Sequence, residues 1–161
     1  MRLAVIADVH GNLPALEAVL ADLARRDAAA VVNLGDCLSG PLWPAETADL
    51  LMRLDFPTVR GNHDRVVAAG DVASMGPTDR FTYDAIGAIG EGRLRWLRGL
   101  PPEVSPAPGI LAVHGCPGDD MAYLLDEVWA GRLFRADAPT IAARLSGQAA
   151  DLVLCGHSHR Q

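Results

Sequence analysis

Short apolar runs recur along this chain, and each of them ends in a cluster of Gly, Asn, Asp or His. The runs cover residues 3–7, 31–34, 58–59, 110–113 and 152–154. Continuous apolar runs of this length are typical of parallel strands that are buried on both faces of a sheet. The pattern therefore predicts five strands, each of which leads into a polar loop.

Helical periodicity separates these runs. In the segment 13–23, leucines repeat at intervals of three or four residues, and Asn12 and Pro14 supply start signals for a helix. Similar patterns occur at 47–54, 94–97 and 141–145, whereas the Gly-rich stretch 70–92 shows no clear periodicity. The prolines at 101–102 and 106–109 indicate turns before the fourth strand. Alternating strands and helices predict an α/β fold with a parallel sheet.

Composition narrows the class of protein. The 161 residues fit a single domain over residues 1–161, and 50% of them are hydrophobic, which is enough to bury a core. The net charge is −6 and all 14 basic residues are Arg without a cluster, so we expect neither nucleic acid nor a membrane surface as a partner. No apolar run approaches the roughly 18 residues of a transmembrane helix. The 3 Cys are an odd number, which argues against a disulfide framework and favours the reducing cytoplasm.

All 5 His of the chain lie just past a predicted strand end, beside Gly or a carboxylate. The clusters are Asp8-Val9-His10-Gly11-Asn12, Gly35-Asp36, Gly61-Asn62-His63-Asp64, His114-Gly115 and Gly156-His157-Ser158-His159. A single His at a strand end is more often a hydrogen-bonded structural residue. In an open α/β sheet, however, ligands bind at the carboxyl ends of the strands. The joint placement of these clusters favours a functional site at that edge.

The residue types in these clusters indicate a metal centre. Asp8 and His10 are spaced so that both reach one ion as a strand becomes a loop, and His157 and His159 have the same spacing. Carboxylate, amide oxygen and imidazole together suit divalent metals such as Mn, Fe, Zn or Co. The candidate ligands outnumber the roughly four of a structural zinc site, which favours two metals that share a bridging carboxylate.

The ordered motifs Asp-x-His, Gly-Asp, Gly-Asn-His-Asp, His-Gly and Gly-His-x-His resemble those of the calcineurin-like metallophosphoesterase superfamily over residues 1–161. The stretch from Gly35 to Pro44 resembles the bacterial predicted-phosphodiesterase branch. It does not resemble the Ser/Thr protein phosphatase branch, which has an Asp-Arg-Gly triplet after this Gly-Asp. The resemblance implies layered sheets with flanking helices and a metal site at the carboxyl ends of the strands.

The resemblance also implies a role for each motif residue. The first metal would be bound by Asp8, His10, Asp36 and His159, and the second by Asp36, Asn62, His114 and His157, with Asp36 as the bridge. His63 would protonate the leaving-group oxygen or steady the phosphoryl oxygens, and Asp64 would orient its ring. The two divalent ions, chosen from Mn, Fe, Zn, Co or Ni, would turn a water into hydroxide near neutral pH.

The implied activity is hydrolysis of a small phosphodiester or phosphomonoester. A nuclease is one alternative, although the acidic charge and the lack of a basic stripe argue against it. A non-catalytic scaffold on the same fold is the other, although the retained Asn62, His63 and Asp64 argue against that role.

Several residues near the motifs have a weaker claim on function. Arg65 and Arg160 flank motifs and are candidates for a bidentate grip on phosphate, although a surface position is favoured slightly for each. The 3 Cys lie near the ligands but are more typical of small buried apolar residues. Relatives with this motif series usually continue into further strands. We expect this domain to lack them, and either to form a homo-oligomer through the exposed edge of the strand 152–154 or to have a first metal site that is weakened by loss of order at His159.

Overall fold

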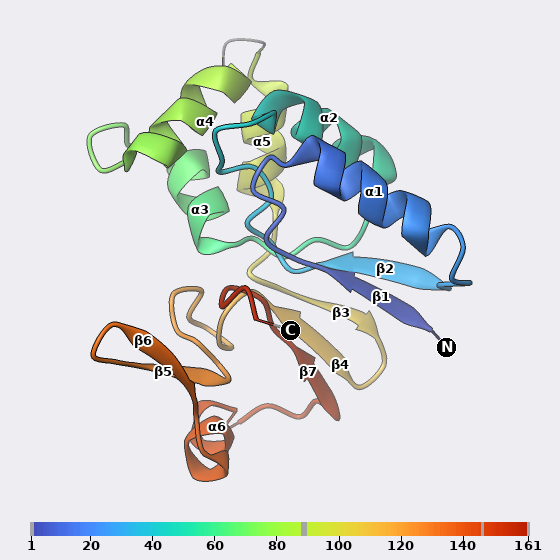
Figure 1. Cartoon of the computed structure of the whole chain (residues 1–161), viewed down its shortest axis with the longest axis vertical. Helices are drawn as coiled ribbons and strands as arrows, with labels where there is room; N and C mark the ends of the chain where they lie inside the picture. The colour runs from blue at the N-terminus through green and yellow to red at the C-terminus, as the bar shows by residue number, and fades with distance from the viewer. Residues whose placement is uncertain (1, 88–89, 146, 161) are drawn as a thin grey trace.

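The computed structural model describes residues 2–87, 90–145 and 147–160, and it shows a layered α/β molecule (Figure 1). The helices are α1 Leu13–Leu23, α2 Pro44–Leu54, α3 Asn62–Ala69, α4 Pro77–Gly87, α5 Gly92–Gly99 and α6 Ala138–Arg144. The strands are β1 Leu3–Ile6, β2 Ala30–Asn33, β3 Glu103–Ala107, β4 Ile110–Val113, β5 Asp126–Trp129, β6 Arg132–Arg135 and β7 Leu152–Leu154. The layered fold with flanking helices is confirmed.

The strands form three small sheets. β1 pairs with β2 in parallel, β4 lies between antiparallel β3 and parallel β7, and β5 and β6 form a hairpin. The strand predicted at 58–59 is reduced to one parallel bridge between Asn33 and Thr58. It ends there because the next backbone N–H on the same side of the segment, that of Gly61, donates to the carboxylate of Asp64 at 3.0 Å and not to β2.

Two apolar clusters hold the layers together. One joins the helices to one face of the β1–β2 sheet and includes Ile6, Leu16, Leu51 and Leu97. The other lies between the sheets and contains Val32, Leu34, Val59 and Ala112. Figure 1 shows the result: α1 and α2 lie over β1 and β2, and the sheet of β3, β4 and β7 lies on the opposite side. Successive side chains of a strand point to opposite faces, which is why a strand buried on both faces, such as 110–113, is apolar throughout.

Several elements were not predicted from the sequence. α4 lies inside the stretch 70–92 that showed no periodicity, and α3 begins within the Gly-Asn-His-Asp motif. Residues 106–107, expected in a turn, belong to β3, whose register shifts between Val104 and Ala107. That irregularity accommodates Pro106, which has no N–H for the ladder, and β3 lies at the edge of its sheet, where proline is tolerated. β3, which was not predicted, thus adds an antiparallel edge to the predicted parallel pairing.

The helix predicted at 13–23 begins as expected. The Asn12 side-chain oxygen accepts the N–H of Ala15 at 3.2 Å, which satisfies one of the free donors of the first turn. Within the described residues, no helix has the length and apolarity that crossing a membrane requires.

Candidate metal centre

The loops that follow β1 and β2 run side by side because backbone pairing continues past the ends of the two strands. Asp8 N–H donates to the Gly35 carbonyl at 2.9 Å, and His10 N–H donates to the Asp36 carbonyl at 2.9 Å. These bonds place three candidate ligands, Asp8, His10 and Asp36, at the carboxyl edge of the β1–β2 sheet. The edge predicted from the sequence is therefore the one on which these side chains meet.

The same loops have an unusual backbone. Five candidate ligands have a positive φ angle, namely Asp8 at 55°, His10 at 50°, Asp36 at 51°, His157 at 69° and His159 at 52°. The left-handed region costs a residue with a side chain about 1–2 kcal/mol, although Asp and His tolerate it better than most. Strain of this kind concentrates at functional sites, where the surrounding structure holds it in place. The strained positions here coincide with the candidate ligands.

The first cluster consists of Asp8, His10 and His159, each of which offers a ligand atom within 4.8 Å of the others. His10 Nδ1 donates to the Ser39 carbonyl at 2.7 Å, so its Nε2 is left facing His159 Nε2 at 3.2 Å. Asp8 Oδ1 lies 3.3 Å from His159 Nε2, yet it is buried and has no hydrogen bond within the described part of the chain. Two imidazole nitrogens that face each other beside an unsatisfied carboxylate oxygen fit a cation.

The second cluster consists of Asp36, His114 and His157, again with ligand atoms within 4.8 Å of one another. His114 Nδ1 donates to the Leu34 carbonyl at 2.8 Å, which leaves Nε2 for a ligand. That Nε2 lies 3.3 Å from Asp36 Oδ2 and 3.0 Å from the amide oxygen of Asn62. All four residues predicted for the second metal are thus brought together.

Asp36 lies between the two clusters. Its Oδ2 is 3.3 Å from His114 Nε2 and 3.9 Å from His10 Nε2, while Oδ1 accepts the backbone N–H of His63 at 3.0 Å. A Cβ added at Gly61 would collide with Asp36 Oδ1, so this close approach requires glycine. Asp36 Oδ1 is thus fixed by a backbone hydrogen bond, while Oδ2 faces both clusters. A bridging ligand requires this arrangement.

Comparison with known proteins identifies the family of this chain. The family model described as calcineurin-like phosphoesterase matches residues 1–161. The chain belongs to the calcineurin-like phosphoesterase family. A metallophosphoesterase from Sphaerobacter thermophilus has a similar structure, with a TM-score of 0.74 and 30% identity over 99% of this chain and 61% of that one.

Two further proteins are similar to parts of this chain in structure or in sequence. A hypothetical protein from Pyrococcus horikoshii has the same fold, with a TM-score of 0.63 and 24% identity over 73% of this chain and 56% of its own. An uncharacterized protein of Methanocaldococcus jannaschii is 42% identical over 62 residues, which are 38% of this chain and 26% of that protein. The chain therefore spans 61% or less of the length of each of these relatives.

The charged forms of the candidate ligands Asp36 and His114 stabilise each other. Burial favours the neutral form of Asp36, but the hydrogen bond and charge of His114, with the charges of His63 and His10, outweigh it and lower its pKa. Burial disfavours protonation of His114, yet the hydrogen bond and charge of Asp36 raise its pKa to about 9. Burial and the charge of His114 lower the pKa of His157. A proton on His114 thus occupies the region that a cation would take.

The structure corrects the expected role of Asp64. Its two carboxylate oxygens accept the backbone N–H groups of Cys37 and Gly61, both at 3.0 Å, so it joins the loop after β2 to the start of α3. Burial, together with the charge of Asp36, raises its pKa to about 6. Consecutive helical residues point in different directions, so Asp64 does not orient the ring of His63. The His63 ring instead contacts Asp79, with Nδ1 2.8 Å from Oδ1.

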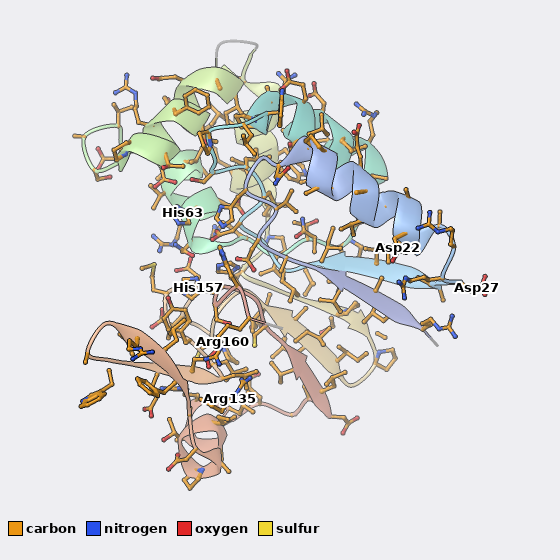
Figure 2. The ribbon with its side chains drawn as sticks, in the orientation of Figure 1. Asp22, Asp27, His63, Arg135, His157 and Arg160 are labelled. Carbon is orange, nitrogen blue, oxygen red and sulfur yellow. The ribbon has the colours of Figure 1, made fainter. Side chains whose placement is uncertain are left out.

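His63 and both clusters open onto one hollow of about 330 Å³, lined by His10, Asp36, His63, Tyr123, His157, Ser158 and His159. Figure 2 shows His63 at the start of α3 and His157 beyond β7, between the helical layer and the lower sheet. The Tyr123 ring is stacked on His157, with ring centroids 4.6 Å apart. The hollow is thus lined by candidate metal ligands and by a candidate proton donor.

The flanking arginines are engaged in ion pairs. Arg65 forms two hydrogen bonds to Asp120, at 2.6 and 2.8 Å, and Arg160 donates to the buried Asp126 at 2.9 Å. The metal-ligand groups found among the described residues contain no cysteine. Cys37 is buried, and burial raises the pKa of its thiol, which disfavours the thiolate that metals bind. Sequence reasoning missed Asp79, because it lies in the segment without recognised periodicity or motif.

Proposed function

We propose that this protein is a hydrolase that cleaves a small phosphoester with two divalent metal ions. The observation that carries the proposal is the position of Asp36, whose Oδ2 faces His10 of one cluster and His114 of the other. Membership of the calcineurin-like phosphoesterase family supports the reaction class.

The proposed ligands follow from the two clusters. Asp8, His10, Asp36 and His159 bind the first ion, and Asp36, Asn62, His114 and His157 bind the second. The two carboxylates carry two negative charges, so a centre with two divalent ions keeps a net positive charge that attracts phosphate. The donor set suits Mn, Fe, Zn, Co or Ni, among which cellular supply decides as much as affinity.

When bound, the two ions supply hydroxide from water near neutral pH and positive charge for the phosphoryl oxygens. The chain supplies the proton for the other side of the reaction. His63 lines the same hollow as the ligands, and we assign it as the general acid that protonates the leaving-group oxygen. General acid catalysis of this kind contributes about 10²–10⁴-fold.

The substrate proposed is a small phosphodiester or phosphomonoester. A hollow of about 330 Å³ is at the lower end of the range for small-molecule sites. The net charge of −6 disfavours a nucleic-acid substrate, because duplex binding relies on clustered basic residues. The cytoplasmic location and the absence of a membrane partner stay predictions of the sequence.

The test is turnover by protein purified without chelator and then loaded with Mn²⁺. A chromogenic phosphodiester, the matching monoester and a labelled DNA oligonucleotide are assayed side by side, with Asp22→Ala, which removes a half-exposed carboxylate of α1, as the control for Asp36→Ala. We expect turnover of a small ester that depends on Mn²⁺, survives in Asp22→Ala and is lost in Asp36→Ala. Bound metal without turnover of any ester would instead support the scaffold, and preferential cutting of DNA would support the nuclease.

A further inference from the structure

The ring of His63 is held from behind by a residue of another helix. His63 Nδ1 lies 2.8 Å from Oδ1 of Asp79, which is in the first turn of α4. An ionised carboxylate can only accept hydrogen bonds, so Nδ1 must be the donor. That assignment leaves Nε2 as the ring nitrogen available to the hollow that His63 lines.

Asp79 is itself held in place. The same Oδ1 accepts the hydroxyl of Ser39 at 2.6 Å, and the carbonyl of Ser39 accepts His10 Nδ1 at 2.7 Å. Asp79 and Ser39 are both buried, with 8% and 3% of their surface exposed. A buried carboxylate whose Oδ1 contacts two partners has little freedom to turn, so its contact with His63 has a defined geometry.

α4 also supports the loop that carries Ser39. The backbone N–H of Gly40 donates to the hydroxyl of Thr82 at 3.1 Å, and Thr82 is fully buried one turn after Asp79. A Cβ at Gly40 would collide with the carbonyl of His10, so this loop presses directly on the loop of the first cluster. α4 therefore connects the proposed proton donor and a proposed metal ligand through a single buried network.

We propose that Asp79 is the positioning residue for His63. Its carboxylate holds the proton on Nδ1 and fixes the ring, so that Nε2 delivers the proton to the leaving-group oxygen. This inference rests on the proposed function, and it assigns to α4 the orienting role that sequence reasoning gave to Asp64. No bond to Asp79 forms or breaks in the reaction, since the proton that moves is the one on Nε2.

The first test compares Asp79→Ala and Asp79→Asn with Asp84→Ala, which removes a carboxylate from the same helix. Asp84 is a matched control because its side chain is 57% exposed and pairs with Arg80 on the surface. Each variant is loaded with Mn²⁺ and assayed on a phenyl ester, whose leaving group needs a proton, and on a nitrophenyl ester, whose leaving group does not.

We expect Asp79→Ala to lower kcat for the phenyl ester by about 10–100-fold and for the nitrophenyl ester by less than about 3-fold, with metal content unchanged. Asp79→Asn keeps an oxygen acceptor and should restore most of the rate, while Asp84→Ala should match wild type. In a His63→Ala background, Asp79→Ala should cause no further loss. Equal losses on both esters, or an additive loss in the double variant, would show that Asp79 is only structural.

A second measurement is independent of turnover. Long-range ¹⁵N–¹H correlation of the metal-free protein reports which ring nitrogen of neutral His63 carries the proton. We expect Nδ1–H in wild type and in Asp79→Asn, and a mixture of the two tautomers in Asp79→Ala. Nε2–H in wild type would overturn the positioning role. Nδ1–H in a wild-type protein that hydrolyses no ester would overturn the proposed function instead, and with it the catalytic use of the ring.

Discussion

The two ligand clusters both face Asp36 but differ in how deeply the fold buries them. In the second cluster, the side chains of Asp36 and His114 are 2% and 0% exposed, whereas His159 of the first cluster is 58% exposed. His114 directly follows β4, the central strand of its sheet, and His159 lies beyond the edge strand β7. The second cluster is therefore mostly buried in the core, although its His157 comes from the same loop after β7 that supplies the more exposed His159 to the first cluster.

This difference separates the candidate ligands whose orientation is set by the fold from those whose order depends on a bound metal ion. His114 donates to Leu34 inside the core, so its orientation is set whenever the chain is folded. The loop of His159 is held by fewer contacts, among them the hydrogen bond of the His157 N–H to Asp8 and the ion pair of Arg160 with Asp126. We expect the second cluster to bind its ion more tightly and the first to depend on the ion for order.

The largest effect should come from Asp36→Ala, which removes the group common to both clusters. Both ions should be lost together, and activity should fall by more than about 10³-fold, the upper end of what removal of one electrostatic group costs. Metal analysis and kcat on the same sample check this. A variant that keeps one ion at full occupancy would break the comparison, because the clusters would not then share a ligand.

Next in size is His63→Ala, which removes a residue of the same hollow that we do not assign as a ligand. Both ions should stay bound, and kcat should fall by about 10²–10⁴-fold for esters with poor leaving groups and much less for good ones. Metal content and kcat across a series of leaving groups measure the two effects. Loss of an ion in this variant would show that His63 is a ligand rather than a proton donor.

A direct contrast between the clusters comes from His114→Ala and His159→Ala. In the metal-free protein, His114→Ala leaves a buried carbonyl unpaired and should cost about 1–3 kcal/mol, a fall in Tm of roughly 2–12 °C. His159→Ala should leave that Tm nearly unchanged, because its ring is largely exposed. Each variant should bind one ion fewer. Equal melting temperatures for the two variants would remove the distinction between the clusters.

The smallest effect expected is the pH dependence of metal binding. Burial opposes protonation of His114, but Asp36 raises its pKa to about 9, so near neutral pH an ion must displace this proton. Affinity at the second cluster should then fall as the pH is lowered from about 9, by at most about tenfold per pH unit. Calorimetric titration in two buffers of different ionisation enthalpy measures the protons released. His114→Ala should release fewer, and an unchanged number would contradict the assignment.

Much of the site was predictable because its ligands follow strands whose apolar runs are visible in the sequence. The parallel pairing of β1 with β2 brings Asp8, His10 and Asp36 to the carboxyl end of one sheet, and that of β4 with β7 brings His114 to the carboxyl end of another, where it meets Asp36. The exact partner of His63 was not predictable, because Asp79 enters from α4, 16 positions along the chain. Helix geometry also excluded Asp64, which sequence adjacency had favoured. Association of two copies through the edge of β7 stays a prediction.

The measurement that tests the account most directly is a titration of metal-free protein with Mn²⁺, with bound metal and turnover followed together. We predict saturation at two equivalents per chain in two steps, the tighter one surviving in His159→Ala, and full turnover only after the second step. Saturation at one equivalent with full turnover would contradict a centre of two ions that share Asp36.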